Sequence, residues 1–112
     1  MSEKRRVTRT WTASYPDPIS ITAGARLDLT GKTDDWGGHI WLWAIAPDGR
    51  EGWVPDTLPD DEGRARRDYS ARELTCTEGD ILLALDRTHG WTLCRSTSGA
   101  EGWVPDANLI PA

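Results

Sequence analysis

Apolar and polar residues alternate along the chain in short stretches separated by turn residues. In Arg26–Leu29 the leucines Leu27 and Leu29 alternate with charged residues, which is typical of a half-buried strand. In Ile40–Ala46 both alternating faces are apolar, which indicates a strand that is covered on both sides, by another part of the protein or by a ligand. Prolines, glycines and aspartates separate these stretches. The pattern predicts an all-β protein, with a polar, Gly-rich loop at residues 30–38.

One hexapeptide, Glu-Gly-Trp-Val-Pro-Asp, occurs twice, at residues 51–56 and 101–106. An identical run of this kind indicates an internal repeat. Trp41 and Trp91 precede the two hexapeptides at the same distance, and the length differences between the copies fall in loops. We therefore expect one small β unit written twice. The predicted organisation is a first unit at residues 7–58, a short polar linker at 59–64 and a second unit at 65–111.

The charge balance narrows the range of partners. The 112 residues carry a formal net charge of −5, which argues against binding to nucleic acid, since such binding needs basic residues to neutralise phosphates. The basic start of the chain is expected to be a solvated tail; its residues are Lys4, Arg5, Arg6 and Arg9. No apolar run approaches the ~20 residues that span a bilayer, so no membrane association is expected. No apolar segment follows the basic start, so we predict no secretory signal and a cytoplasmic location.

Few side chains point to chemistry. Cys76 and Cys94 are expected to be free thiols that act as small apolar residues. A disulfide between them is the alternative if their side chains face each other. A metal site would need more ligands than the nearby His89 can add. The acidic residues fall in turns and linkers rather than in pairs that could act in a cleft. The sequence therefore predicts a protein without catalytic activity, metal or cofactor.

A series of short motifs runs through the second copy. In chain order they are Ala-Arg-Arg-Asp-Tyr at 65–69, Glu-Leu-Thr-Cys at 73–76, Gly-Asp at 79–80, Gly-Trp at 90–91 and Gly-Trp-Val-Pro at 102–105. In this order and spacing they resemble the Src homology 3 (SH3) domain, and the first copy is similar through fewer positions. The resemblance implies two tandem five-stranded SH3-like barrels of the bacterial variant type, packed against each other.

The SH3 family binds Pro-rich peptides in a groove of aromatic side chains, because a pre-extended peptide loses little entropy on docking. This chain departs from the family where Arg67 replaces the first motif tyrosine and Ala107–Asn108 replaces the closing Asn-Tyr. Trp36 is counted among the candidate ligand-binding residues because it lies in a Gly-rich segment and has no evident role in the core. The candidate ligand-binding residues are Trp41, Pro55, Trp36, Tyr69, Trp91 and Pro105.

The two copies differ on one strand face. Arg26 and Asp28 of the first copy correspond to Ile81 and Leu83 of the second, which predicts an apolar interface between the copies. The candidate inter-domain residues are Ile81, Leu83, Trp43, Trp53 and Trp103.

These patterns lead to one preferred function and two alternatives. The preferred one is a non-catalytic interaction module that binds a peptide, Pro-rich in the family's usual manner, or a partner protein through Trp-lined surfaces. The first alternative is a structural unit whose aromatic faces are used between the copies or in self-association. The second is the binding of cell-wall peptides, which the predicted lack of an export signal opposes.

Overall fold

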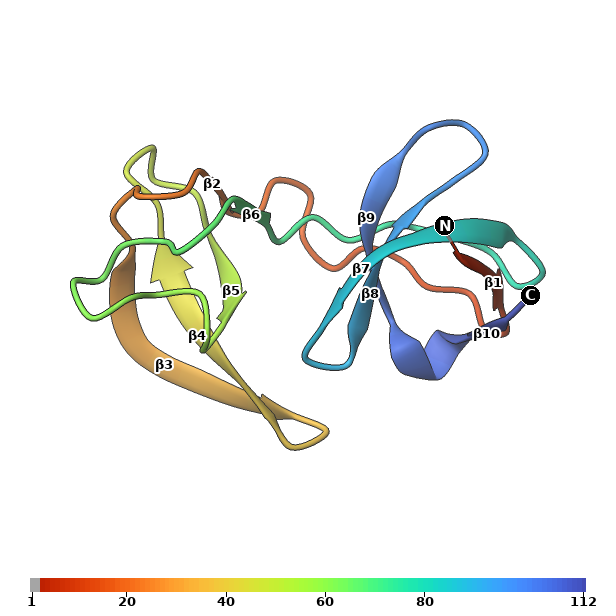
Figure 1. Ribbon diagram of the computed structural model, residues 1–112, viewed down its shortest axis with the longest axis horizontal. Coiled ribbons are helices and arrows are strands. Elements are labelled where there is room, and N and C mark those ends of the chain that lie inside the picture. The colour runs from red at the N-terminus through yellow and green to blue at the C-terminus, as the bar shows by residue number, and fades with distance from the viewer. Residues whose placement is uncertain (1–2) are drawn as a thin grey trace. The chain divides into compact units, whose positions relative to one another are not determined.

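The computed structural model describes residues 3–112 and confirms that the chain is all-β (Figure 1). Within these residues the regular elements are strands and one short 3-10 turn, η1 (Asp106–Asn108). The strands are β1 (Glu3–Val7), β2 (Ser20–Ile21), β3 (Asp28–Trp36), β4 (His39–Ile45), β5 (Glu51–Pro55), β6 (Tyr69–Ser70), β7 (Ile81–Thr88), β8 (Trp91–Arg95), β9 (Glu101–Pro105) and β10 (Leu109–Pro111). They form a five-stranded sheet in the order β10-β1-β7-β8-β9, a three-stranded sheet β3-β4-β5 and the pair β2-β6.

The repeated hexapeptide forms the same element in both copies. Its first five residues are β5 in the first copy and β9 in the second, and each strand pairs with the Trp-bearing strand before it. The register is identical, because Trp41 lies opposite Pro55 and Trp91 lies opposite Pro105. The internal repeat therefore extends from sequence to strand pairing.

The compact units of the structure do not coincide with the sequence copies. One unit, called unit 1 here, consists of the chain up to Pro16 together with Arg72–Ala112. The other, unit 2, is the continuous segment Asp17–Ala71. The domains expected at 7–58 and 65–111 stay a prediction about the sequence repeat, and the two compact units divide the chain at other positions. The start of each copy is built into the unit that holds the rest of the other copy.

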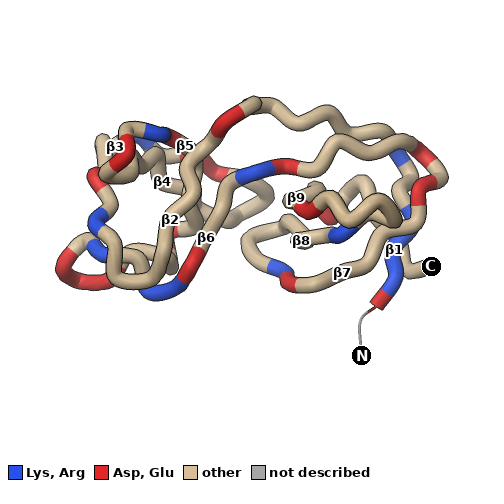
Figure 2. Tube along the Cα trace, turned by 90° about the horizontal axis from the view of Figure 1, so that it is seen from above, with Lys and Arg blue, Asp and Glu red and all other residues tan. Residues whose placement is uncertain are grey.

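Strand β1 carries this exchange in unit 1. It pairs antiparallel with β7 along Glu3–Arg6 and with β10 along Arg5–Val7, both of which belong to the second copy. The basic residues at its centre, blue in Figure 2, were expected to form a solvated tail. They lie in a strand instead, because backbone pairing on both sides and the buried side chain of Val7 hold the segment in place.

Equivalent hydrogen bonds show the same exchange in unit 2. In unit 1 the backbone N–H of Gly79 donates to the carbonyl of Val7 over 2.7 Å. In unit 2 the N–H of Gly24 donates to the carbonyl of Ala65, also over 2.7 Å. Val7 and Ala65 begin the two copies, and each is bonded to a turn of the opposite copy. The two units are therefore built alike, with their first segments interchanged.

Residues 59–64, expected to be a linker between domains, form a tight turn inside unit 2. The N–H of Asp60 donates to the carbonyl of Arg64 over 2.8 Å, and Pro59 and Ala65 form an antiparallel bridge. Gly63 has φ +77°, a conformation that glycine adopts at little cost. This turn is the physical reason for the exchange. It folds the start of the second copy directly back onto the end of the first, so the first copy's own strand lies in unit 1.

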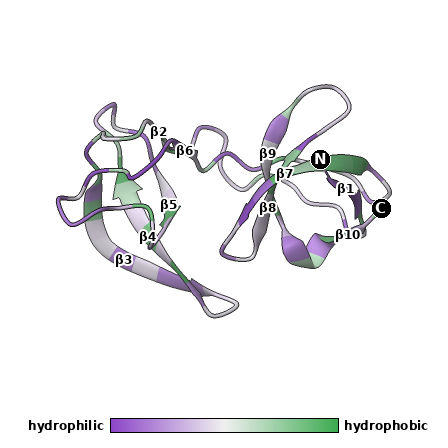
Figure 3. Ribbon diagram, viewed as in Figure 1, coloured by the Kyte–Doolittle hydropathy of each residue, from purple (hydrophilic) through white to green (hydrophobic). Residues whose placement is uncertain are grey.

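The core of unit 1 combines residues from both copies. Val7 of β1 packs with residues of the second copy, and Trp11 and Leu109 pack against the same cluster. Figure 3 shows the hydrophobic residues concentrated on β4 in unit 2 and on β7 in unit 1. The other members of the buried cluster are Leu74, Cys76, Leu82, Cys94 and Val104.

The predicted loop at residues 30–38 is also different in the structure. Strand β3 continues through Trp36 and pairs with β4 as far as His39, with a bulge between Leu29 and Thr33. All nine residues of β3 are exposed, and no apolar alternation marks the strand in the sequence beyond Leu29. Cross-strand backbone bonding to β4, rather than burial, accounts for its regular structure.

Candidate functional site

Two tryptophans from different copies meet in unit 1. Trp11 follows β1, and its main chain forms an antiparallel bridge with Cys76. Trp91 begins β8, and the two indole rings lie edge to face, with centroids 5.4 Å apart and an interplanar angle of 80°. Both side chains are half-buried, whereas Pro105, the cross-strand partner of Trp91, is fully buried. The family resemblance makes Trp91 and Pro105 candidate ligand-binding residues, which stays a prediction, and the structure places Trp11 of the first copy against Trp91.

Glu73 fixes the position of Trp11. Its Oε1 atom accepts hydrogen bonds from Trp11 Nε1 at 3.0 Å, from the Ser14 backbone N–H at 3.1 Å and from Ser14 Oγ at 3.2 Å. The backbone N–H of Ala13 donates to Thr75 Oγ1 at 3.0 Å beside it. The Glu73 carboxylate thus holds the segment that follows β1 against the segment of the second copy that contains Glu73. Sequence reasoning did not assign this role, because the two partners are far apart in the chain.

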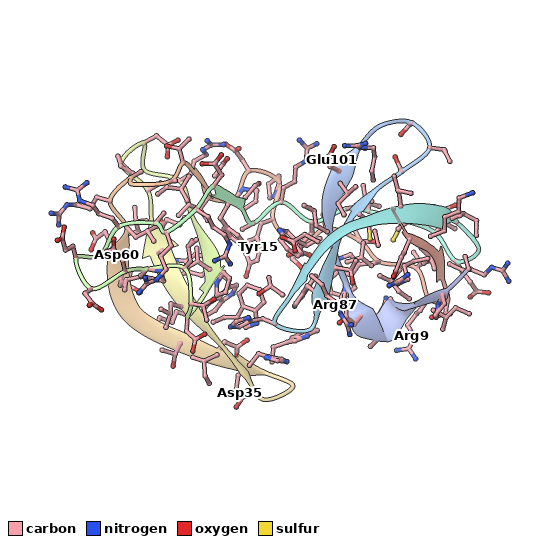
Figure 4. The ribbon with its side chains drawn as sticks, in the orientation of Figure 1. Arg9, Tyr15, Asp35, Asp60, Arg87 and Glu101 are labelled. Atoms are coloured by element: carbon pink, nitrogen blue, oxygen red, sulfur yellow. The ribbon has the colours of Figure 1, made fainter. Side chains whose placement is uncertain are left out.

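An acidic residue follows the buried proline of unit 1. Asp106 accepts a hydrogen bond from Thr92 Oγ1 at 2.6 Å and forms an ion pair with Arg87 Nε at 3.0 Å. Figure 4 shows Arg87 at the end of β7 near the 3-10 turn that contains Asp106. The carboxylate is thereby held at the end of β9, the strand that pairs with the Trp91 strand β8.

The candidate ligand-binding tryptophan and tyrosine of unit 2 are more deeply buried than Trp11 and Trp91 of unit 1. Trp41 is 7% exposed, Tyr69 is 8% exposed and Pro55 is fully buried. Tyr69 Oη donates to the carbonyl of Trp53 at 3.4 Å. Tyr69 belongs to the second copy and Trp41 to the first, so the candidate residues of unit 2 also come from both copies.

A cationic side chain covers a second tryptophan pair in unit 2, which we call the Lys32 cluster (Lys32, Trp43 and Trp53). The two rings pack edge to face at 5.0 Å and 82°. Lys32 Nζ lies 5.0 Å from the Trp43 centroid and 5.4 Å from that of Trp53, within cation–π range. Trp43 Nε1 donates to Glu51 Oε1 at 2.8 Å. A role for Trp43 and Trp53 between domains stays a prediction.

The remaining candidates lie at separate places in the fold. Trp36 is 38% exposed at the end of β3. Ile81 and Leu83 lie on β7, where they are register partners of Arg6 and Lys4 of β1. Trp103 is 7% exposed on β9, in register with Leu93. The predicted inter-domain role of Ile81, Leu83 and Trp103 likewise stays a prediction.

The two cysteines are free and buried in the core of unit 1. Burial raises the pKa of the Cys94 thiol to about 11 and also raises the pKa of Cys76. Both thiols are therefore protonated near neutral pH, which makes them poor nucleophiles and poor metal ligands. Among residues 3–112 no three His, Cys, Asp or Glu side chains gather as a metal site would require. Nor does that part of the chain include a helix able to cross a membrane.

The fold and the paired aromatic residues define a tandem SH3-type protein. A family model described as the variant SH3 domain matches the chain twice, at residues 4–58 and 63–112. The chain therefore belongs to the variant SH3 family and contains two copies of its domain. Domains of this kind generally mediate protein–protein interaction and are typically non-catalytic. Searches of curated proteins and of solved structures found no match. The matched segments follow the sequence copies rather than the two physical units.

Proposed function

We propose that this protein is a non-catalytic interaction module that binds an extended, Pro-containing peptide of a partner protein along the aromatic surface of unit 1. The observation that carries the proposal is the contact between Trp11 and Trp91 beside the buried Pro105. Two half-buried indoles offer a rigid apolar surface on which a peptide in an extended conformation can stack at low entropic cost.

The comparison between the units favours unit 1 as the binding unit. Trp11 and Trp91 keep part of their surface exposed, whereas Trp41 and Tyr69 of unit 2 are covered to more than nine-tenths. An apolar surface contributes hydrophobic binding energy only where a ligand removes it from water. We therefore assign Trp41, Pro55 and Tyr69 to the framework of unit 2 and the ligand contacts to unit 1.

The test is a titration of the full chain with a pool of Pro-rich peptides, followed through the seven indole N–H signals in a ¹H–¹⁵N NMR spectrum. We expect the signals of Trp11 and Trp91 to shift and that of Trp43 to stay in place. The variants Trp11→Phe and Trp91→Phe should weaken binding, and Trp43→Phe, in unit 2, is the matched control. A pool that moves no indole signal, or that moves only the Trp43 signal, would overturn the proposal.

One observation favours a structural function as the second candidate. Each unit contains a segment of the other sequence copy, so neither copy can separate without leaving both units incomplete. Such interlocking suits a rigid spacer or scaffold, in which the two units close into barrels that act only as supports. A protein of this kind would give a flat response across the whole peptide pool while keeping a cooperative thermal transition.

A further inference from the structure

The place of β1 in unit 1 is a slot between two strands of the second copy. One edge of β1 is paired with β7 and the other with β10, so its departure would leave unpaired backbone groups along both neighbours. It would also uncover the cluster of buried side chains on which Val7 packs, including Cys76 and Cys94. An open slot of this kind has a strong tendency to pair with a strand of matching sequence.

We propose that this slot also accepts β1 of a second copy of the chain, so that two chains associate by reciprocal exchange of the segment from Glu3 to Pro16. The strand is already exchanged between the two sequence copies of one chain. The same backbone pairs, the same Val7 contact and the same bonds to Glu73 form whether the segment arrives from its own chain or from another.

The structure locates the hinge for this exchange. Unit 2 begins at Asp17, and its two ends are held together by the pairing of Ser20 with Ser70 and of Ile21 with Tyr69. Unit 2 can therefore stay closed when the preceding segment leaves unit 1. The hinge lies between these pairs and Trp11, in a stretch with prolines at positions 16 and 18. Prolines restrict their own backbone and that of the preceding residue toward extended conformations, which suits a segment that reaches another molecule.

The balance between the two forms depends on concentration. Because both forms make the same contacts, the intrachain form is favoured mainly by the effective concentration of a tethered segment, which is in the millimolar range for short tethers. We therefore expect monomers at ~10 μM and a substantial exchanged fraction after refolding at ~1 mM. In an exchanged dimer Trp11 of one chain would meet Trp91 of the other, so each aromatic surface would be completed across chains.

Cysteine pairing across the slot tests the proposal directly. Arg6 and Ile110 are register partners and are both exposed, so Arg6→Cys and Ile110→Cys should fold normally. Paired strand positions lie at a Cα separation that a disulfide can bridge. The two single variants are mixed, unfolded, refolded together with reductant at high or low concentration, and oxidised only after Cys76 and Cys94 are buried again. Each single variant refolded alone is the control for unspecific crosslinking.

We expect a disulfide-linked heterodimer that is at least ten times more abundant after refolding at the higher concentration. Arg6→Cys combined with Ile110→Cys in one chain should instead crosslink within the monomer at low concentration. A monomer at every concentration, with only intrachain crosslinks, would overturn exchange between chains. Asp60 is the counterpart of Ile110 in the first copy, so a crosslink between Arg6→Cys and Asp60→Cys would overturn the exchange within the chain as well.

Discussion

The glycine of the repeated hexapeptide offers a quantitative test of how the two units are closed. A Cβ atom on Gly102 would lie 2.6 Å from the carbonyl carbon of Glu73 and 2.6 Å from the backbone nitrogen of Leu74. On Gly52 it would lie 2.9 Å from Cγ2 of Ile19, a side chain rather than a backbone. The same substitution in the same hexapeptide should therefore have different costs in the two copies.

The loss in free energy of unfolding for Gly102→Ala depends on the backbone atoms that the new Cβ would displace. The Glu73 backbone lies beside β9 in a parallel bridge to Trp103, flanked by the bonds from Trp103 N to Arg72 O at 2.9 Å and from Leu74 N to Trp103 O at 3.0 Å. Overpacking costs about 1–3 kcal/mol, and each stretched hydrogen bond costs about 1 kcal/mol more. Alanine also lowers the conformational entropy of the unfolded chain relative to glycine, which stabilises the folded state by about 0.4–1 kcal/mol. The net loss should be about 2–5 kcal/mol.

For Gly52→Ala only the buried Ile19 side chain and its backbone nitrogen are crowded, so the net loss should be about 1 kcal/mol. At about 4–8 °C per kcal/mol in a domain of this size, Gly102→Ala should melt at least ~8 °C below the wild type, and Gly52→Ala should lie between them. Thermal melting followed by circular dichroism measures the shifts, and amide hydrogen exchange shows which unit opens. A Gly102→Ala protein that melts with the wild type, or above Gly52→Ala, would refute the close approach of the two backbones.

Three further predictions follow from single contacts. Glu73→Ala should lower the free energy of unfolding by about 1–3 kcal/mol in urea titrations, because the groups of Trp11 and Ser14 lose their acceptor, and Glu73→Gln should recover part of the loss; equal losses would contradict this role. Lys32→Ala should cost about 0.5–1 kcal/mol and shift the tryptophan emission, and an unchanged emission would exclude the cation–π contact. Burial raises the pKa of the Cys94 thiol from 9.0 to about 11, so the unfolded chain loses this proton first and stability should fall between pH 9 and 11; Cys94→Ala should flatten that slope, and an unaltered slope would exclude the cause.

The sequence predicts the strands and the repeat well because both depend on local patterns. Apolar alternation over Ile40–Ala46 places β4 within one residue of its observed bounds, His39–Ile45. The shared hexapeptide also predicts the common register of Trp91 and Pro105 with their counterparts. Only the start of strand β3 is predicted, because its exposed residues carry no apolar alternation beyond Leu29.

Strand patterns could not predict which segments of the chain make up each compact unit. Because the two copies share a fold, a strand such as β1 fits the sheet of either copy, and local sequence does not distinguish the two pairings. The deciding feature is the tight turn that begins at Asp60 and ends at Gly63. Its Asp and its positive-φ Gly are ordinary turn signals, but the same residues are equally typical of a polar linker.

The contact of Trp11 with Trp91 could not be predicted for the same reason. Trp11 belongs to the first copy, whereas Trp91, whose ring it contacts, belongs to the second.

For the proposed ligand, the exchange would link binding to the position of β1. A ligand that contacts both Trp11 and Trp91 binds only when the segment from Glu3 to Pro16 is docked in unit 1, because Trp11 leaves with that segment. Such a ligand at a hundred times its Kd stabilises the docked state by about 2.7 kcal/mol, comparable to the loss expected for the Glu73 variant. The docked strand can come from the same chain or from a second one, since both complete the same surface. Ligand binding should therefore slow the interconversion of monomer and exchanged dimer without favouring either form.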